Sequence, residues 1–136
     1  MRVLHVVPRL SPQSGGPSIA LPGLARCLVN HGIDTTLLAT TAGSNSRLDV
    51  PLNQPVIRDG VAYVFHRVLA IGGRYGLSPS MWKALRRVIA TYDIVHIHFL
   101  YDFSCTAAAR AAIAGGVPFV VQPAGSLDPY LLRKNR

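Results

Sequence analysis

The sequence is poor in cysteine, in acidic residues and in long apolar runs. Its 136 residues include only Cys27 and Cys105, without C-x-x-C spacing. This excludes a disulfide framework and a thiolate metal site, so we expect both to be small buried residues. No apolar run approaches the roughly 18 to 20 residues of a membrane span. The opening run ends at Pro8, which is too early for a signal peptide.

The few acidic residues leave a strongly basic chain. Six Asp and Glu stand against 14 Lys and Arg, a formal charge of +8. Three interpretations remain open: an anionic membrane surface, a phosphorylated substrate, or a basic face that is merely solvated. The arginines are scattered and are not interleaved with aromatics, so nucleic acid is not an expected partner. The apolar content of 49% predicts a folded core rather than disorder.

Short apolar runs alternate with helical patterns along the chain. Apolar and β-branched runs predict strands over 3–7, 35–40, 93–98 and 119–121. Asp59-Gly60 between two such runs predicts a hairpin over 56–65. Helices are predicted from Pro17 or Pro22 to Gly32, after the Ser78-Pro79 cap, over 103–114, and from the Asp128-Pro129 cap. The order predicts an α/β, Rossmann-like domain, in which a mostly parallel sheet carries helices on both faces.

Three loops of this fold leave the carboxyl ends of strands, where open α/β sheets bind their ligands. The first holds Gly15, Gly16, Pro17 and Ser18. This loop is either a phosphate-binding helix start or an ordinary turn that precedes a helix. It is neither a G-x-G-x-x-G fingerprint nor a P-loop. The third holds Gly125 and Ser126, whose backbone amides we expect near the same rim, and Asp128, which we expect to cap a helix rather than act as an acid.

The second loop follows a strand with two histidines. His96 and His98 point to the same face of that strand. No third ligand has matching spacing, so no metal is expected. His96 is interpreted as a core histidine. His98 and Tyr101 lie nearer the strand end, and His98 is the better candidate for touching a ligand.

Together these motifs resemble the N-terminal domain of family 4 glycosyltransferases, which have the two-domain GT-B fold. The resemblance covers nearly the whole chain. It rests on Val3-Leu4-His5-Val6-Val7-Pro8, Gly15-Gly16-Pro17-Ser18, Asp93-Ile94-Val95-His96-Ile97-His98, Gly116-Val117-Pro118-Phe119-Val120-Val121 and Pro123-Ala124-Gly125-Ser126-Leu127-Asp128-Pro129.

The resemblance implies a retaining transfer of a sugar from a nucleotide-sugar to a glycan, a lipid-linked or another acceptor. Residues 1–136 would form the acceptor-side domain, with Gly15-Gly16 against the donor diphosphate and His98 as the catalytic candidate. The donor-binding C-terminal domain is expected to be the missing partner, since the chain stops in a helix barely begun. Alone, the chain is therefore expected to be inactive. No cofactor is expected, and the location would be cytoplasmic, with the inner membrane face as a peripheral site.

One position departs from the family pattern. Many members have an active-site histidine where this chain has Ala124, and alanine cannot hold a proton or donate a side-chain hydrogen bond. Two other classes stay open: a non-catalytic binding module or remnant of such an enzyme, and a small oxidoreductase domain. The latter is disfavoured because Thr40-Thr41 stands where a dinucleotide-binding domain ends its second strand with an acid.

Overall fold

A computed structural model describes residues 1–11, 16–43, 48–69, 71 and 75–134. The strands are β1 (Arg2–Arg9), β2 (Asp34–Thr40), β3 (Pro55–Arg58), β4 (Val61–His66), β5 (Ile94–His98) and β6 (Phe119–Gln122). The helices are α1 (Gly16–Asn30), α2 (Pro79–Val88), the 3₁₀ turn η3 (Ile89–Thr91), α3 (Phe103–Gly115) and α4 (Pro129–Lys134). The alternation predicted from the sequence is confirmed.

The strands form one six-stranded sheet in the order β3-β4-β2-β1-β5-β6. All neighbouring pairs are parallel except β3 with β4, which is the predicted hairpin. β1 lies inside the sheet between β2 and β5, and its residues from Val3 to Pro8 are buried. A strand covered on both faces has to be apolar almost throughout, which explains the unbroken run at the start of the chain.

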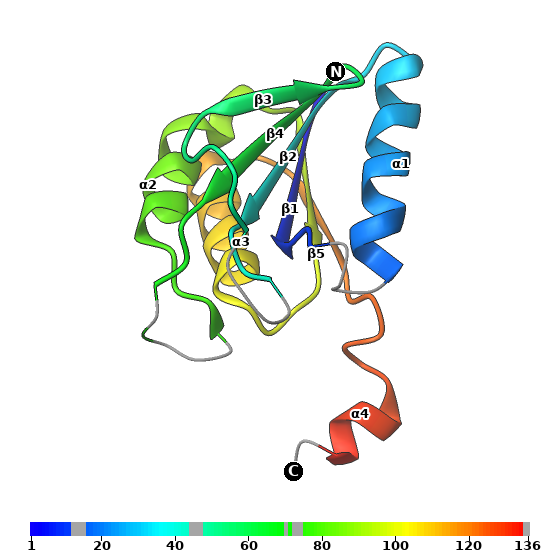
Figure 1. The fold of residues 1–136 in the computed structure, drawn as a ribbon, viewed down its shortest axis with the longest axis vertical. Coiled ribbons are helices and arrows are strands. Elements are labelled where there is room, and N and C mark those ends of the chain that lie inside the picture. Colours follow the sequence, from blue (N-terminus) through cyan, green and yellow to red (C-terminus); the bar gives the residue numbers. More distant parts are fainter. Residues whose placement is uncertain (12–15, 44–47, 70, 72–74, 135–136) are drawn as a thin grey trace.

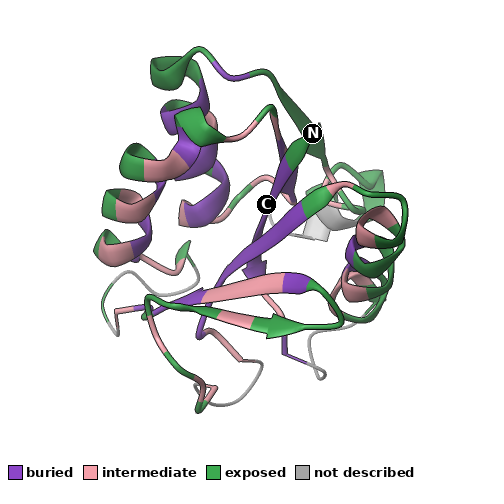
Figure 2. Cartoon of the chain, turned by 90° about the horizontal axis from the view of Figure 1, so that it is seen from above, coloured by how far each residue is buried: buried purple, intermediate pink, exposed green. Residues whose placement is uncertain are grey.

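Helices cover both faces of this sheet (Figure 1). On one face, Leu21 and Ala25 of α1 pack with Val7, Leu37 and Phe65. On the other face, the apolar sides of α2 and α3 form a larger core, whose members include Leu4, Val6, Met81, Leu85, Val95, Ile97, Ala108 and Ala112. The inner strands are buried, while the outward faces of the helices are exposed (Figure 2). The α/β class with helices on both faces is therefore confirmed.

The helix starts differ in part from their sequence signals. α1 begins at Gly16 and continues through Pro22, so a start at Pro22 is wrong. Ser78 holds the N-cap position of α2, but its hydroxyl donates to the Arg67 carbonyl oxygen at 2.7 Å instead of capping the helix. Asp128 caps α4 as predicted, since its Oδ1 accepts the Tyr130 amide at 2.7 Å.

The two cysteines differ in burial, although the sequence analysis predicted that both are buried. Cys105 is buried, and its thiol donates to the His98 carbonyl oxygen at 3.2 Å. Cys27 is exposed, so the expectation that both are buried is wrong for this residue. The reason is helical phase: Leu21 and Ala25 take the inward side of α1, and Cys27 lies two positions further round.

The last elements lie at the margin of the sheet. β6 is an edge strand whose four residues are all exposed, and α4 extends away from the rest of the domain (Figure 1). The exposed basic residues Lys83, Arg86 and Arg87 lie on the outer side of α2, as predicted. Among the described residues, every helix falls short of the length and apolarity needed to cross a membrane.

The β3–β4 turn constrains both the backbone conformation of Gly60 and the space around it. Asp59 and Gly60 both have positive φ, 50° and 77°, as a two-residue hairpin turn of type I′ requires. A Cβ on Gly60 would also meet Val29 Cγ1 at 2.8 Å. We predict that Gly60→Ala lowers the free energy of unfolding by about 1 to 2 kcal/mol, measured by urea denaturation.

The matched control for this prediction is Gly23→Ala. Gly23 lies inside α1, and a Cβ there meets nothing within 4 Å. Alanine is the better helix former, so this variant should gain about 0.5 to 1 kcal/mol. Equal effects of the two substitutions would contradict the role given to the turn.

Candidate functional site

A cavity opens between α1 and the carboxyl ends of β5 and β6. Its volume is about 340 Å³, and α1 lines one wall with Pro17, Ala20, Leu21 and Leu24. The opposite wall is formed by His98, Gln122 and Ala124. This is the side of a parallel sheet where ligands bind, because all the strands of such a sheet end there. One wall is thus apolar and the other carries neutral polar groups.

The cavity gathers only some of the residues singled out in the sequence. Pro17 and His98 line it. Gly16 begins α1, and the Ser18 hydroxyl donates to the Arg9 carbonyl oxygen at 3.4 Å, so it ties the helix start to the end of β1. Gly15 lies outside the described residues.

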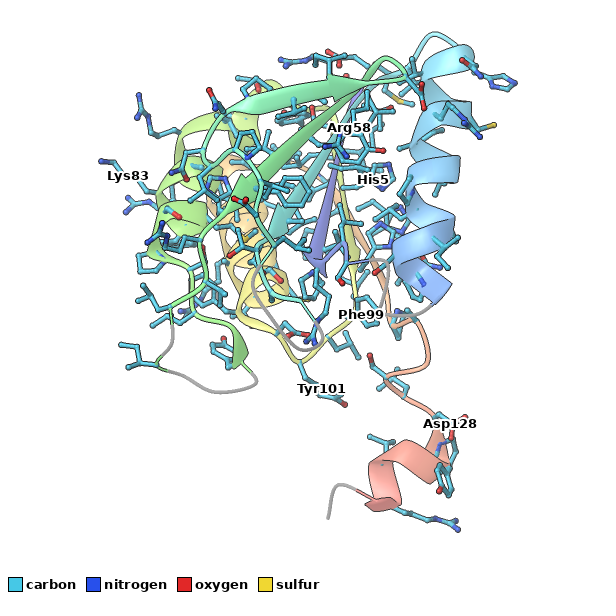
Figure 3. The ribbon with its side chains drawn as sticks, in the orientation of Figure 1. His5, Arg58, Lys83, Phe99, Tyr101 and Asp128 are labelled. Atoms are coloured by element: carbon cyan, nitrogen blue, oxygen red, sulfur yellow. The ribbon has the colours of Figure 1, made fainter. Side chains whose placement is uncertain are left out.

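Tyr101, Gly125 and Ser126 are not among the described residues that line the cavity. Tyr101 is 63% exposed, and in Figure 3 it points away from the sheet. Gly125 and Ser126 belong to a turn in which the Ser126 amide donates to the Pro123 carbonyl oxygen at 2.9 Å. That amide is therefore engaged within its own turn, and the expected role of Gly125 and Ser126 at the rim stays a prediction. Ala124, which does line the cavity, has a φ of 48°.

Three histidines meet on the α1 side of the sheet. Leu4 and Val6 of β1 face the opposite core, so His5 between them faces α1 (Figure 3). The same alternation turns His96 and His98 of β5 to this side. The register of β1 with β5 sets His5 directly opposite His96. The ring centroids are 5.1 Å apart for His5–His96, 5.4 Å for His5–His98 and 4.1 Å for His96–His98.

These imidazoles, which we call the histidine cluster, share few hydrogen bonds. His5 Nδ1 and His98 Nε2 lie 3.1 Å apart, so one of them donates to the other. His5 is 1% exposed and His98 is 4% exposed, whereas His96 is half-buried. The sequence analysis expected His96 to be the core residue, but His98 is the more buried of the two. The sequence analysis missed His5 as a site residue. The available signal was a polar residue in the middle of an otherwise apolar strand, a position that His96 also has in its own strand.

Burial keeps the histidine cluster uncharged. It lowers the pKa of His5 from 6.5 to about 3, and the neighbouring His98 and His96 lower it further. Burial also lowers the pKa of His98 to about 4, with a smaller contribution from His96, against an opposing interaction with Gln122. The pKa of His96 is lowered by burial too. At neutral pH, His98 therefore meets the cavity as a neutral imidazole, which can donate or accept one hydrogen bond but cannot pair with a phosphate as a cation.

A salt bridge lies at the end of β1. Arg9 Nη2 contacts Asp102 Oδ1 at 3.3 Å, which joins β1 to the start of α3. Burial raises the pKa of Asp102, and the guanidinium of Arg9 opposes that rise. The pair is a positioning contact between two of the loops that leave strand ends.

The lowered pKa values predict a loss of stability in acid. The unfolded chain titrates its histidines near 6.5, while folded His5 and His98 resist protonation down to about 3 and about 4. The unfolded state therefore binds more protons in this interval, so stability falls as the pH drops from 6.5 to 4. Thermal unfolding midpoints across this range, measured with EDTA present, should show the fall.

Two variants test the source of this pH dependence. His98→Gln keeps a hydrogen-bonding group near Nε2 but cannot titrate, so its midpoint should fall less steeply with acid. His31→Gln removes an exposed histidine and should keep the wild-type profile. A His98→Gln profile parallel to that of the wild type would contradict the assignment.

Comparison with known proteins adds the family. No curated protein matches the chain. The family model described as Glycosyltransferase Family 4 matches residues 14–135, which is most of the chain. The match includes the start of α1, the β5 histidines and Ala124, and so all the cavity-lining residues that the structure describes. The chain belongs to glycosyltransferase family 4.

Proposed function

We propose that the chain is the acceptor-side domain of an enzyme that transfers a sugar, with retention, from a nucleotide-sugar to a glycan, lipid-linked or other acceptor. Family membership supports glycosyl transfer in general. The observation that carries the proposal further is the place of Ala124. The family resemblance puts the active-site histidine of many members at this position, and Ala124 lines the cavity between α1 and β5–β6.

The lining of this cavity suits an uncharged sugar. A sugar ring presents apolar C–H faces and hydroxyl groups, and the cavity offers Ala20, Leu21 and Leu24 on one wall with His98 and Gln122 on the other. Neutral side chains that hydrogen-bond hydroxyls, set among apolar ones, are typical of sites that orient small molecules. The lowered pKa of His98 makes it a hydrogen-bond partner for a hydroxyl rather than a strong base.

The start of α1 suits the leaving diphosphate of the sugar donor. The leaving diphosphate gains negative charge in the transition state, and a helix N-terminus stabilises negative charge with its unpaired amides and its dipole. Pro17, in the first turn of α1, lines the same cavity as His98. We therefore place the donor diphosphate near Gly16, and the sugar to be transferred over the cavity.

His98 can supply the side-chain hydrogen bond that Ala124 cannot make. Both residues line the cavity, and among the described lining residues His98 carries the imidazole. A neutral imidazole there can hold a sugar hydroxyl in place. We propose this positioning role for His98, in line with its choice as the catalytic candidate from the sequence.

We predict that filling the cavity removes sugar binding. Ala20→Trp places an indole on the α1 wall and should weaken binding at least 10-fold, because the sugar and the ring compete for one space. Binding of neutral mono- and disaccharides to the chain is measured by saturation-transfer NMR. Ala114→Trp, at an exposed position of α3, is the matched control and should bind like the wild type.

Binding that survives Ala20→Trp, or a chain that binds none of these sugars, would overturn the site. Transfer itself is tested by adding a donor-side domain of the family in trans, together with its nucleotide-sugar. Product formation separates a transferase from a non-catalytic binding module, because both would bind sugar.

A lipid-linked acceptor would bring the domain to an anionic membrane surface. Lys83, Arg86 and Arg87 form an exposed basic face on α2. We predict that the chain sediments with phosphatidylglycerol vesicles at low salt and that Lys83→Glu with Arg87→Glu reduces the bound fraction several-fold. Arg26→Glu with Arg58→Glu changes the net charge equally at exposed positions outside α2 and should have less effect. Equal losses would assign the effect to net charge alone.

A further inference from the structure

The histidine cluster has a second chemistry that the proposed transfer does not use. His5, His96 and His98 each offer a ring nitrogen, and the three ligand atoms lie within 4.8 Å of one another. They come from two strands whose sequences are about 90 residues apart, so the cluster exists only in the folded domain. The sequence-based expectation of no metal considered only the two histidines of β5 and lacked this third ligand.

The spacing of two of these nitrogens already fits a metal ion. A tetrahedral zinc site with Zn–N bonds of about 2.0 to 2.1 Å holds its ligand nitrogens about 3.3 Å apart. His5 Nδ1 and His98 Nε2 are 3.1 Å apart, so their separation already fits such a site, and the ion would replace the proton that they share. His96 stacks on His98 and is half-buried, so rotation of its ring can bring the third nitrogen into the same sphere.

The ligand chemistry favours a zinc-class ion over a hard cation. Three neutral imidazoles suit zinc and its neighbours, whereas magnesium and calcium need oxygen ligands. Metal binding requires an unprotonated ring nitrogen, and His5 and His98 offer theirs from buried positions. His98 lines the cavity and His96 is partly exposed, which gives an ion a route to the site.

We propose that His5, His96 and His98 bind one zinc-class divalent cation in the wall of the cavity. Three protein ligands leave a fourth position open, as in zinc sites that exchange a water or a substrate oxygen. Because His98 also lines the cavity, this position is available to water or to a hydroxyl of a molecule bound there. The ion is a ligand of this domain in its own right, whether or not the domain takes part in sugar transfer.

The test uses the 136-residue chain without a polyhistidine tag, stripped with EDTA and dialysed. Zn²⁺ is titrated by calorimetry, and Co²⁺ is titrated as a spectroscopic probe of coordination. We expect one Zn²⁺ per chain with micromolar or tighter affinity, and a visible Co²⁺ band of tetrahedral type that Zn²⁺ displaces. The absence of stoichiometric binding would overturn the proposal.

Variants locate the ion. His96→Gln removes the least buried ligand, so it is the least disruptive to folding, and it should weaken Zn²⁺ binding at least 100-fold and abolish the Co²⁺ band. His98→Gln should do the same, with circular dichroism confirming that each variant is folded. Binding at wild-type strength in either folded variant would overturn the assignment.

The matched control addresses a rival pair on the surface. Cys27 Sγ in α1 and His31 Nδ1 just after that helix lie 3.9 Å apart, and a thiolate with an imidazole is a ligand pair that suits zinc. His31→Gln should leave the Zn²⁺ affinity and the Co²⁺ band unchanged, and loss of binding in this variant would move the site to α1 and overturn the proposal. Ala20→Trp should keep the zinc site even where it removes sugar binding, so the failure of one proposal is distinguishable from the failure of the other.

Discussion

Parallel pairing of β1 with its two neighbours is the constraint on which this domain depends. β1 pairs with β2 on one side and with β5 on the other, in a register that sets His5 beside His96. At the amino end, the Arg2 amide donates to Asp93 Oδ2 at 2.6 Å, which anchors the start of the same pairing. Because the central strands are parallel, their carboxyl ends reach one edge together. The loops that build the cavity are adjacent for this reason, although they are distant in sequence.

The same pairing places polar groups on a face that would otherwise be apolar. Buried imidazoles cost free energy unless they are neutral and hydrogen-bonded. Here burial keeps the ring of His5 neutral, and His5 and His98 share a hydrogen bond. Core residues chosen only for stability would be apolar at these positions, as Val3 and Val7 are in the same strand. Three histidines on one face therefore indicate a role beyond packing, and both the sugar site and the metal site proposed here use His98.

Local signals predicted the elements well where backbone geometry alone decides. Asp59-Gly60 specified its hairpin because the turn needs two residues at positive φ. Asp128-Pro129 specified a helix start because the carboxylate caps a free amide. The signals failed where packing decides. α1 continues through Pro22 because its early turns bury Leu21 and Ala25, and Cys27 is exposed because its phase on that helix faces solvent.

By itself, the sequence determined the α/β class, the order of the elements, the hairpin and the glycosyltransferase resemblance, because these depend on periodicity, turn residues and short motifs along the chain. It also singled out His98, which is the last residue of β5, and Pro17, which lies in the first turn of α1. Only the tertiary structure decided that His5 joins His96 and His98, that Tyr101 is exposed, that the Ser126 amide is engaged in its own turn, and that Ala124 lies in the cavity wall. The physical reason is that strand register and helix packing bring distant residues together, and the residue spacing within one segment determines neither of them.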